Sequence, residues 1–125
     1  MIRWFERHNL FSWLITIIGA ILIFYFSSIS VKSTPGGLSI TSYLYHFYAF
    51  FCFAAFLMIS LLKGKFNKLL AITGITVACF YALTDELHQL FVPYRSCNIT
   101  DVFTDFTGIL FASVLYLLII KNRKN

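Results

Sequence analysis

The chain contains four apolar stretches that are each long enough to cross a lipid bilayer. A transmembrane helix needs about 20 apolar residues to span about 30 Å of hydrocarbon. The stretches at residues 10–31, 43–62, 69–92 and 102–120 meet this requirement and leave no room for a soluble domain. We therefore predict an all-α integral membrane bundle of four transmembrane helices, forming a single domain over residues 1–125.

The composition excludes an ordinary soluble protein. The chain is 59% hydrophobic and 12% charged, whereas soluble domains are about 45–50% apolar and about 25% charged. The formal net charge of +5 does not indicate a nucleic-acid partner, because most basic residues flank the predicted helices, where anionic lipids attract them. We expect a multi-pass protein of the cell membrane whose main partner is the lipid bilayer, and the sequence leaves its oligomeric state open.

The basic residues predict the orientation of the bundle. Short cytoplasmic segments of membrane proteins are enriched in Lys and Arg. The first and third predicted loops contain only Lys32 and Arg95. The other basic residues of the helix flanks lie in the N-terminal segment, the second loop and the C-terminal segment: Arg3, Arg7, Lys63, Lys65, Lys68, Lys121, Arg123 and Lys124. Both termini should therefore be cytoplasmic, with the first and third loops outside.

Acidic residues are concentrated near the predicted outer face. Asp85 and Glu86 lie inside the third apolar stretch, Asp101 lies directly before the fourth, and Asp105 lies near its start. An ionisable side chain in a membrane segment is costly, so it is by default a candidate for function. With this orientation, Ser27, Ser28 and Ser30 at the end of the first helix and Tyr43, Tyr45 and His46 at the start of the second reach the same face.

Helical spacing predicts which of these residues share a face. At about 100° per residue, Asp85, His88 and Gln89 lie on one face together with Tyr81, and Glu86 lies at its margin. On the fourth predicted helix the aligned residues are Asp101, Asp105, Gly108 and Ala112. Gly108 and Ala112 form a small-xxx-small pair that allows close helix approach, so we expect the third and fourth helices to pack along these faces.

The same region carries signals for helix ends. Pro93 cannot continue a helical hydrogen-bond ladder, so it marks the end of the third helix. Thr100 is the predicted N-cap of the fourth.

We predict an outward-facing polar pocket with two sets of site residues. As catalytic candidates, Asp85 or Glu86 would act as a base and His88 or His46 as a proton shuttle. The pocket would be completed by Ser28, Gln89, Arg95, Asp101 and Asp105. Arg95 could bridge the acids or bind a phosphate or carboxylate in bidentate fashion. The alternative is that the group is a buried hydrogen-bond network that holds two helices in register.

The sequence predicts no cofactor and no metal site. His46, Asp85, Glu86, His88, Asp101 and Asp105 offer nitrogen and oxygen ligands, so a divalent metal stays an alternative, but no HExxH or comparable spacing is present. The serines are expected to bond backbone carbonyls one turn back instead of acting as nucleophiles. Cys52 and Cys79 lie within predicted helices and Cys97 in an outer loop, so no disulfide is implied. The aromatic run from Tyr43 to Phe56 favours lipid contact, and it could also line a groove for an acyl chain.

The polar segment resembles a known family. Residues 85–95 read DELHQLFVPYR, and Asp101-Val102 and Gly108 follow. This is similar to the VanZ-like family, in which a DE-x-x-Q-x-F-x-P-x-R run leads into a helix with D-V-x-x-x-x-x-G. The match covers roughly residues 24–118, including Ser27-Ser28 and His46-Phe47. Tyr94 replaces the usual Gly, and Ile29-Ser30 stands where many members carry Asp-Lys.

The resemblance implies a membrane protein of the cell envelope. The namesake of the family is an accessory protein of low-level resistance to the glycopeptide antibiotic teicoplanin, so one hypothesis is reduced susceptibility to such antibiotics. A second is a small membrane hydrolase or transferase acting on a lipid or lipid-linked phosphate at the outer face. A third is a non-catalytic binding or assembly module. The ligand would be a lipid, a lipid-linked molecule or a glycopeptide. A transporter fits less well, because four helices would have to oligomerise to form a pathway.

Overall fold

A computed structural model shows an all-helical chain and describes residues 1–30, 40–95 and 97–123. These residues form five helices, and no strand occurs among them. The helices are α1 (Ile2–Arg7), α2 (Asn9–Ser28), α3 (Ile40–Leu62), α4 (Lys68–Gln89) and α5 (Ile99–Asn122). In the described ranges, four of them, α2 to α5, are long and apolar enough to cross a membrane. The prediction of an all-α bundle with four transmembrane helices is confirmed.

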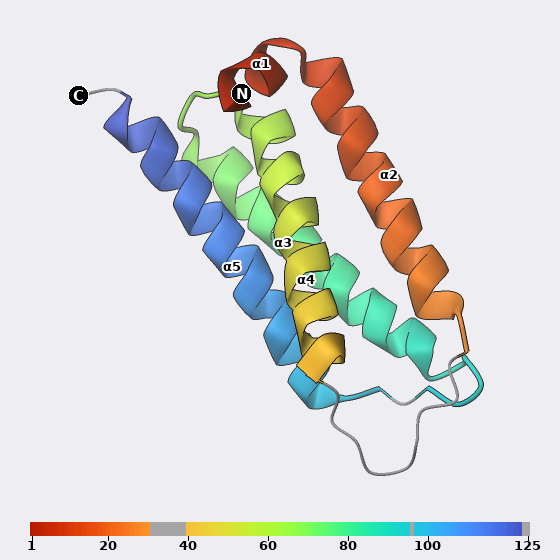
Figure 1. Ribbon diagram of the computed structural model, residues 1–125. Helices are drawn as coiled ribbons and strands as arrows, with labels where there is room; N and C mark the ends of the chain where they lie inside the picture. The colour runs from red at the N-terminus through yellow and green to blue at the C-terminus, as the bar shows by residue number, and fades with distance from the viewer. Residues whose placement is uncertain (31–39, 96, 124–125) are drawn as a thin grey trace.

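The four long helices alternate in direction, so their polar ends meet (Figure 1). The N-terminus and the C-terminal end of α5 lie at one end of the bundle. The last turns of α2 and α4 and the first turns of α3 and α5 lie at the other, which we call the polar end. Large apolar side chains such as Ile17, Ile21 and Leu118 are exposed on the outer surface, as expected for a surface that contacts lipid. The polar residues of four distant segments are thus brought to one face.

The helix limits differ from the predicted ones in several places. α4 ends at Gln89, before Val92 and Pro93, and its backbone continues into a turn in which the Val92 amide bonds the Gln89 carbonyl. The prediction that Thr100 caps α5 is wrong. Asn98 is the N-cap, because its backbone is extended and its side-chain oxygen accepts a hydrogen bond from the Thr100 amide at 3.1 Å.

The structure also differs from the prediction at α3, α2 and α1. α3 begins at Ile40, ahead of Tyr43. α2 ends at Ser28, and the predicted end of the first helix at residue 31 lies outside the described residues. The six residues of α1 were not predicted as a helix, because six residues are too few to give a periodic pattern.

Gly108 lets α5 approach the backbone of α3. A Cβ atom added at Gly108 would lie 2.5 Å from the Phe47 carbonyl oxygen and 3.2 Å from the Phe51 amide nitrogen. The small-residue prediction was therefore right about close approach and wrong about the partner, since Gly108 faces α3 and not α4. This contact sets the distance between the helices that carry His46 and Asp105.

An ion pair closes the opposite end of the bundle. Both carboxylate oxygens of Glu6 accept hydrogen bonds from Nη1 of Arg123, at 2.8 and 2.7 Å. The Tyr116 hydroxyl donates to Glu6 at 2.9 Å and accepts from the Gly64 amide at 3.1 Å. The fifth acidic residue thus joins the N-terminal segment to the end of α5, far from the polar end.

We predict that Gly108→Ala destabilises the protein, whereas Gly19→Ala does not. The added methyl group at position 108 must push α3 and α5 apart, and overpacking of this kind costs about 1–3 kcal/mol. No atom lies within 4 Å of the corresponding Cβ at Gly19, so alanine there should be neutral or stabilise the helix by up to about 1 kcal/mol. Thermal unfolding of both variants in detergent measures the difference. Equal transition temperatures for the two variants would contradict the close approach.

Candidate functional site

Five polar side chains are buried together at the polar end. They are 4% exposed or less and come from three helices: His46 of α3, Asp85, Glu86 and Gln89 of α4, and Asp105 of α5. Glu86 was expected at the margin of its face, but it is 1% exposed. Asp85, Glu86 and Asp105 therefore lie inside the bundle, as the predicted alternative of a buried hydrogen-bond network requires. We call these five residues the acidic cluster.

Hydrogen bonds connect the members of the acidic cluster. His46 Nδ1 lies 3.0 Å from Asp105 Oδ1 and 3.9 Å from Glu86 Oε1. Gln89 donates from Nε2 to Glu86 Oε1 at 3.1 Å and to Asp85 Oδ2 at 3.3 Å. The backbone amide of Asn98 donates to Glu86 Oε2 at 3.2 Å. Glu86 is thus held from α4, from the loop before α5, and by the nearby imidazole.

Several buried oxygen atoms of this region lack a hydrogen-bond partner in the described part of the chain. They are Asp85 Oδ1, Asp105 Oδ2 and the hydroxyl of Ser27. A buried acceptor without a partner costs about 1–3 kcal/mol. Such atoms are therefore concentrated where the chain carries its acids, which is typical of a site that binds something else.

A second polar group at the same end attaches α2 to α4. Arg95 donates from Nη2 to the Phe26 carbonyl at 2.9 Å, from Nε to the Ile29 carbonyl at 3.2 Å, and from Nη1 to Gln89 Oε1 at 3.4 Å. The two carbonyls lie at the C-terminal end of α2, where backbone carbonyls lack the usual helical partner four residues on, and the Phe26 carbonyl also accepts from the Ile29 amide at 3.3 Å. Among the described residues, Arg95 forms no salt bridge with a carboxylate.

Ser28 and His88 belong to this second group. The Ser28 hydroxyl donates to the Phe24 carbonyl at 2.7 Å, which confirms the expected bond to the preceding turn, and it also lies 3.0 Å from His88 Nε2. The His88 ring packs against Phe24, with ring centroids 4.5 Å apart. The residues predicted as one pocket are therefore divided between the acidic cluster and a connection from α4 to α2.

Asp101 lies beside the acidic cluster, in the first turn of α5. Its carboxylate and single ligand atoms of His46 and Glu86 all lie within 4.8 Å of one another. These are the described residues whose side chains come close enough to share a metal ion. Asn98, which sequence reasoning missed, joins the site through its backbone amide, a contact that no side-chain pattern can reveal.

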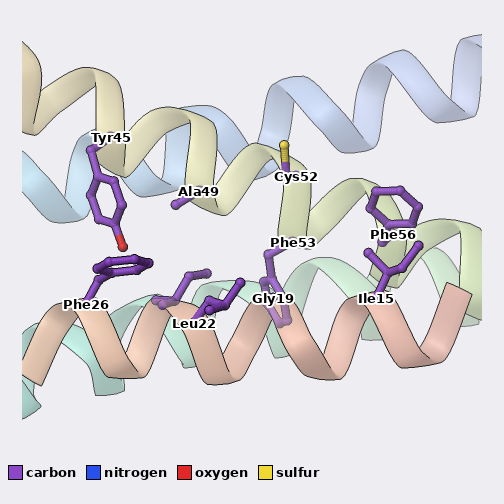
Figure 2. A pocket seen from close by; sticks show the side chains of 10 residues that line it. Ile15, Gly19, Leu22, Phe26, Tyr45, Ala49, Cys52, Phe53 and Phe56 are labelled. Carbon is purple, nitrogen blue, oxygen red and sulfur yellow. The ribbon is translucent and has the colours of Figure 1, made fainter.

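An apolar groove runs between α2 and α3, and one of its ends is formed by Phe26 and Tyr45 (Figure 2). Its volume is about 270 Å³. It is lined by residues with the same helical spacing on both sides: Ile15, Gly19, Leu22, Ile23 and Phe26 on α2, and Tyr45, Ala49, Cys52, Phe53 and Phe56 on α3. Figure 2 shows Tyr45 and Phe26 facing each other at one end, and Ile15 and Phe56 at the other.

Tyr45 and Phe26, at one end of the groove, connect it with the polar end of the bundle. Tyr45 precedes His46, with ring centroids 5.7 Å apart, and the carbonyl of Phe26 accepts a hydrogen bond from Arg95. Residues 45 and 56 are separated by about 16 Å along a helix, which is about half of the roughly 30 Å hydrocarbon thickness. The groove therefore extends from the polar end over about one leaflet.

The fold and the site define the class of this membrane protein. Four apolar helices with a buried acidic cluster at one end make it a multi-pass α-helical membrane protein. The VanZ/LLP1 family profile matches residues 6–120, nearly the whole chain, so the protein belongs to the VanZ/LLP1 family. The resemblance seen in the sequence is thereby confirmed. No curated protein and no solved structure matches the chain.

Proposed function

We propose that this VanZ/LLP1-family protein binds a lipid or lipid-linked molecule in the cell envelope, with the hydrocarbon chain in the groove and the polar head at the acidic cluster. The observation that carries the proposal is the continuity of the groove with the polar end, at Tyr45–His46 and Phe26. The apolar lining suits a hydrocarbon chain. Inside a bilayer such a chain gains nothing from leaving the surrounding lipid tails, so van der Waals packing against the lining would decide its affinity. The length of about 16 Å matches the depth of one leaflet.

The polar end would face the outside of the cell. The basic residues of the N-terminal segment, the second loop and the end of α5 support this orientation through the positive-inside rule. The lipid would then belong to the outer leaflet of the cytoplasmic membrane, where lipid-linked cell-wall precursors are also exposed. Reduced susceptibility to a teicoplanin-type antibiotic would follow from a change in that lipid or its availability.

A catalytic role in the same site is a second candidate. The contact between His46 and the buried carboxylate of Asp105 supports it, because a carboxylate that orients an imidazole is a recurrent part of general-base catalysis. His46 would take a proton from water or a hydroxyl group that attacks the phosphate or acyl group of the lipid head. The bond from that group to the leaving oxygen would break as the new bond forms, and the imidazolium would return the proton to the leaving oxygen. Glu86, Asp85 and Gln89 would position the attacking water or hydroxyl group. The enzyme would be a small hydrolase or transferase.

Lipid binding predicts that filling the groove removes a bound lipid. Wild-type protein purified in mild detergent should retain lipid that is extractable and identifiable by mass spectrometry. Ala49→Phe places a ring between α2 and α3 and should remove most of it. Leu118→Phe adds the same ring on the exposed surface of α5, outside the groove, and should leave the retained lipid unchanged. Equal lipid content in Ala49→Phe and wild type would exclude the groove as the binding site.

The acidic cluster should be needed for activity more than for folding. We expect Glu86→Gln to abolish the effect of the protein on teicoplanin susceptibility, and any modification of the bound lipid, because a neutral amide cannot replace the carboxylate. Glu6→Gln is the matched control at the opposite end and should keep both. Thermal unfolding in detergent is measured in parallel. A Glu86→Gln protein that retains full activity, or that fails only because it unfolds, would favour the non-catalytic assembly role.

The orientation predicts that Cys97 reacts with an impermeant maleimide on intact cells. In a Cys52→Ala/Cys79→Ala background, Cys97 is the remaining cysteine, and it is exposed. Desolvation and the nearby Glu86 carboxylate raise the pKa of the Cys97 thiol. Since the thiolate is the reactive form, labelling should be slow at neutral pH and faster at about pH 8.5. Lys65→Cys in a Cys52→Ala/Cys79→Ala/Cys97→Ala background is the control for the opposite face and should react only after lysis. The reverse pattern would invert the proposed orientation.

A further inference from the structure

The acidic cluster contains more buried acids than cationic partners. Asp85, Glu86 and Asp105 are each 4% exposed or less. Arg95 reaches the same end of the bundle, but its hydrogen bonds go to two backbone carbonyls and to the amide of Gln89. His46 is the group that lies close to two of the carboxylates, at 3.0 and 3.9 Å. One imidazole cannot balance three buried carboxylates.

An excess of buried negative charge has a physical cost that must be met by protons or by a cation. Ionised carboxylates away from water are tolerated when they are paired or bind a metal. The donors from Gln89 and from the Asn98 amide satisfy individual oxygen atoms, but they are neutral and leave the charge in place. A bound cation would remove the imbalance in one step.

We infer that His46, Glu86 and Asp101 bind a divalent transition-metal ion. One ligand atom of each residue lies within 4.8 Å of the others, so small side-chain rotations can bring all three to about 2.0–2.2 Å from one ion. The three residues come from α3, α4 and α5, and the ion would therefore connect three helices. The remaining coordination positions would be open to water or to a ligand.

Asp105 gives independent support for an ion at this position. It lies one turn after Asp101 on α5, and its Oδ1 is 3.0 Å from His46 Nδ1. The same nitrogen lies 3.9 Å from Glu86 Oε1, so the ion would be bound through Nε2, with the Asp105 carboxylate on Nδ1 fixing the orientation of the imidazole as carboxylates do for metal-binding histidines. The second oxygen, Oδ2, is buried and has no hydrogen-bond partner in the described part of the chain. A water molecule bound to the ion can donate to it.

The ligand set indicates which metals fit. One imidazole nitrogen and two carboxylates suit Zn²⁺ or Mn²⁺, whereas Mg²⁺ and Ca²⁺ prefer oxygen ligands alone. The ion would also allow the acidic cluster to accept a phosphate group, which bare carboxylates repel. The metal site itself rests on the ligand geometry and the charge imbalance, and it stands whether or not the bound molecule is a lipid.

Zn²⁺ binding to the purified full-length protein tests the inference. After treatment with a chelator and removal of any affinity tag, titration with Zn²⁺ should show one ion per chain, retained through desalting and measured by elemental analysis. His46→Asn, Glu86→Gln and Asp101→Asn should each weaken binding at least tenfold. Zn²⁺ should also raise the unfolding temperature of these three variants less than that of the wild type.

Two matched variants separate this site from adventitious binding. His88→Gln removes another histidine of the polar end, and Glu6→Gln removes a buried acid of the opposite end, so both should bind Zn²⁺ as wild type does. Co²⁺ substitution in wild type should give the visible absorption of a protein-bound ion, a result that does not depend on how any variant folds. Absence of Zn²⁺ and Mn²⁺ binding to wild type, or loss only in His88→Gln, would overturn the inference. Metal binding with no retained lipid would leave it intact and contradict the proposed function.

Discussion

The contact between His46 and Asp105 organises the polar end of the bundle. It joins α3 to α5 inside a membrane protein, where polar atoms must find partners within the chain. Gly108 makes the contact possible, since it lets α5 lie against the backbone of α3 at Phe47. Glu86 and Gln89 of α4 then complete the cluster around the imidazole. One close helix approach thus determines where the acids of three helices can meet.

The two polar groups at this end have different structural tasks. Arg95 and the Ser28–His88 contact hold the end of α2 against α4. Arg95 donates to two backbone carbonyls and to the Gln89 side chain, and Ser28 bonds the Phe24 carbonyl and His88. The acidic cluster has buried oxygen atoms without partners. The first group therefore explains how the helices are connected, and the second has the unused capacity that a binding site needs.

The apolar spans, their alternation and the face that collects the polar residues were predictable from the sequence. Runs of about 20 apolar residues indicate transmembrane helices. Short loops between them then require successive helices to run in opposite directions. Which helices pair was not predictable. Gly108 was assigned to the wrong neighbour, and Arg95 bonds carbonyls at the end of α2, because spacing along one helix gives a face but not the helix opposite it. Likewise, the proposed metal ligands come from three helices, so they produce no local motif.

The groove between α2 and α3 would also determine how the proposed lipid arrives. Leu22, Phe26 and Tyr45 line it and are exposed on the side of the bundle, a surface that faces the hydrocarbon in a membrane. A molecule that enters there diffuses in two dimensions and never leaves the bilayer. Its access depends on its concentration among the surrounding lipids and not on its solubility in water. If the proposed lipid binds in this groove, a protein of this size would select a very insoluble ligand without a tunnel or a moving lid.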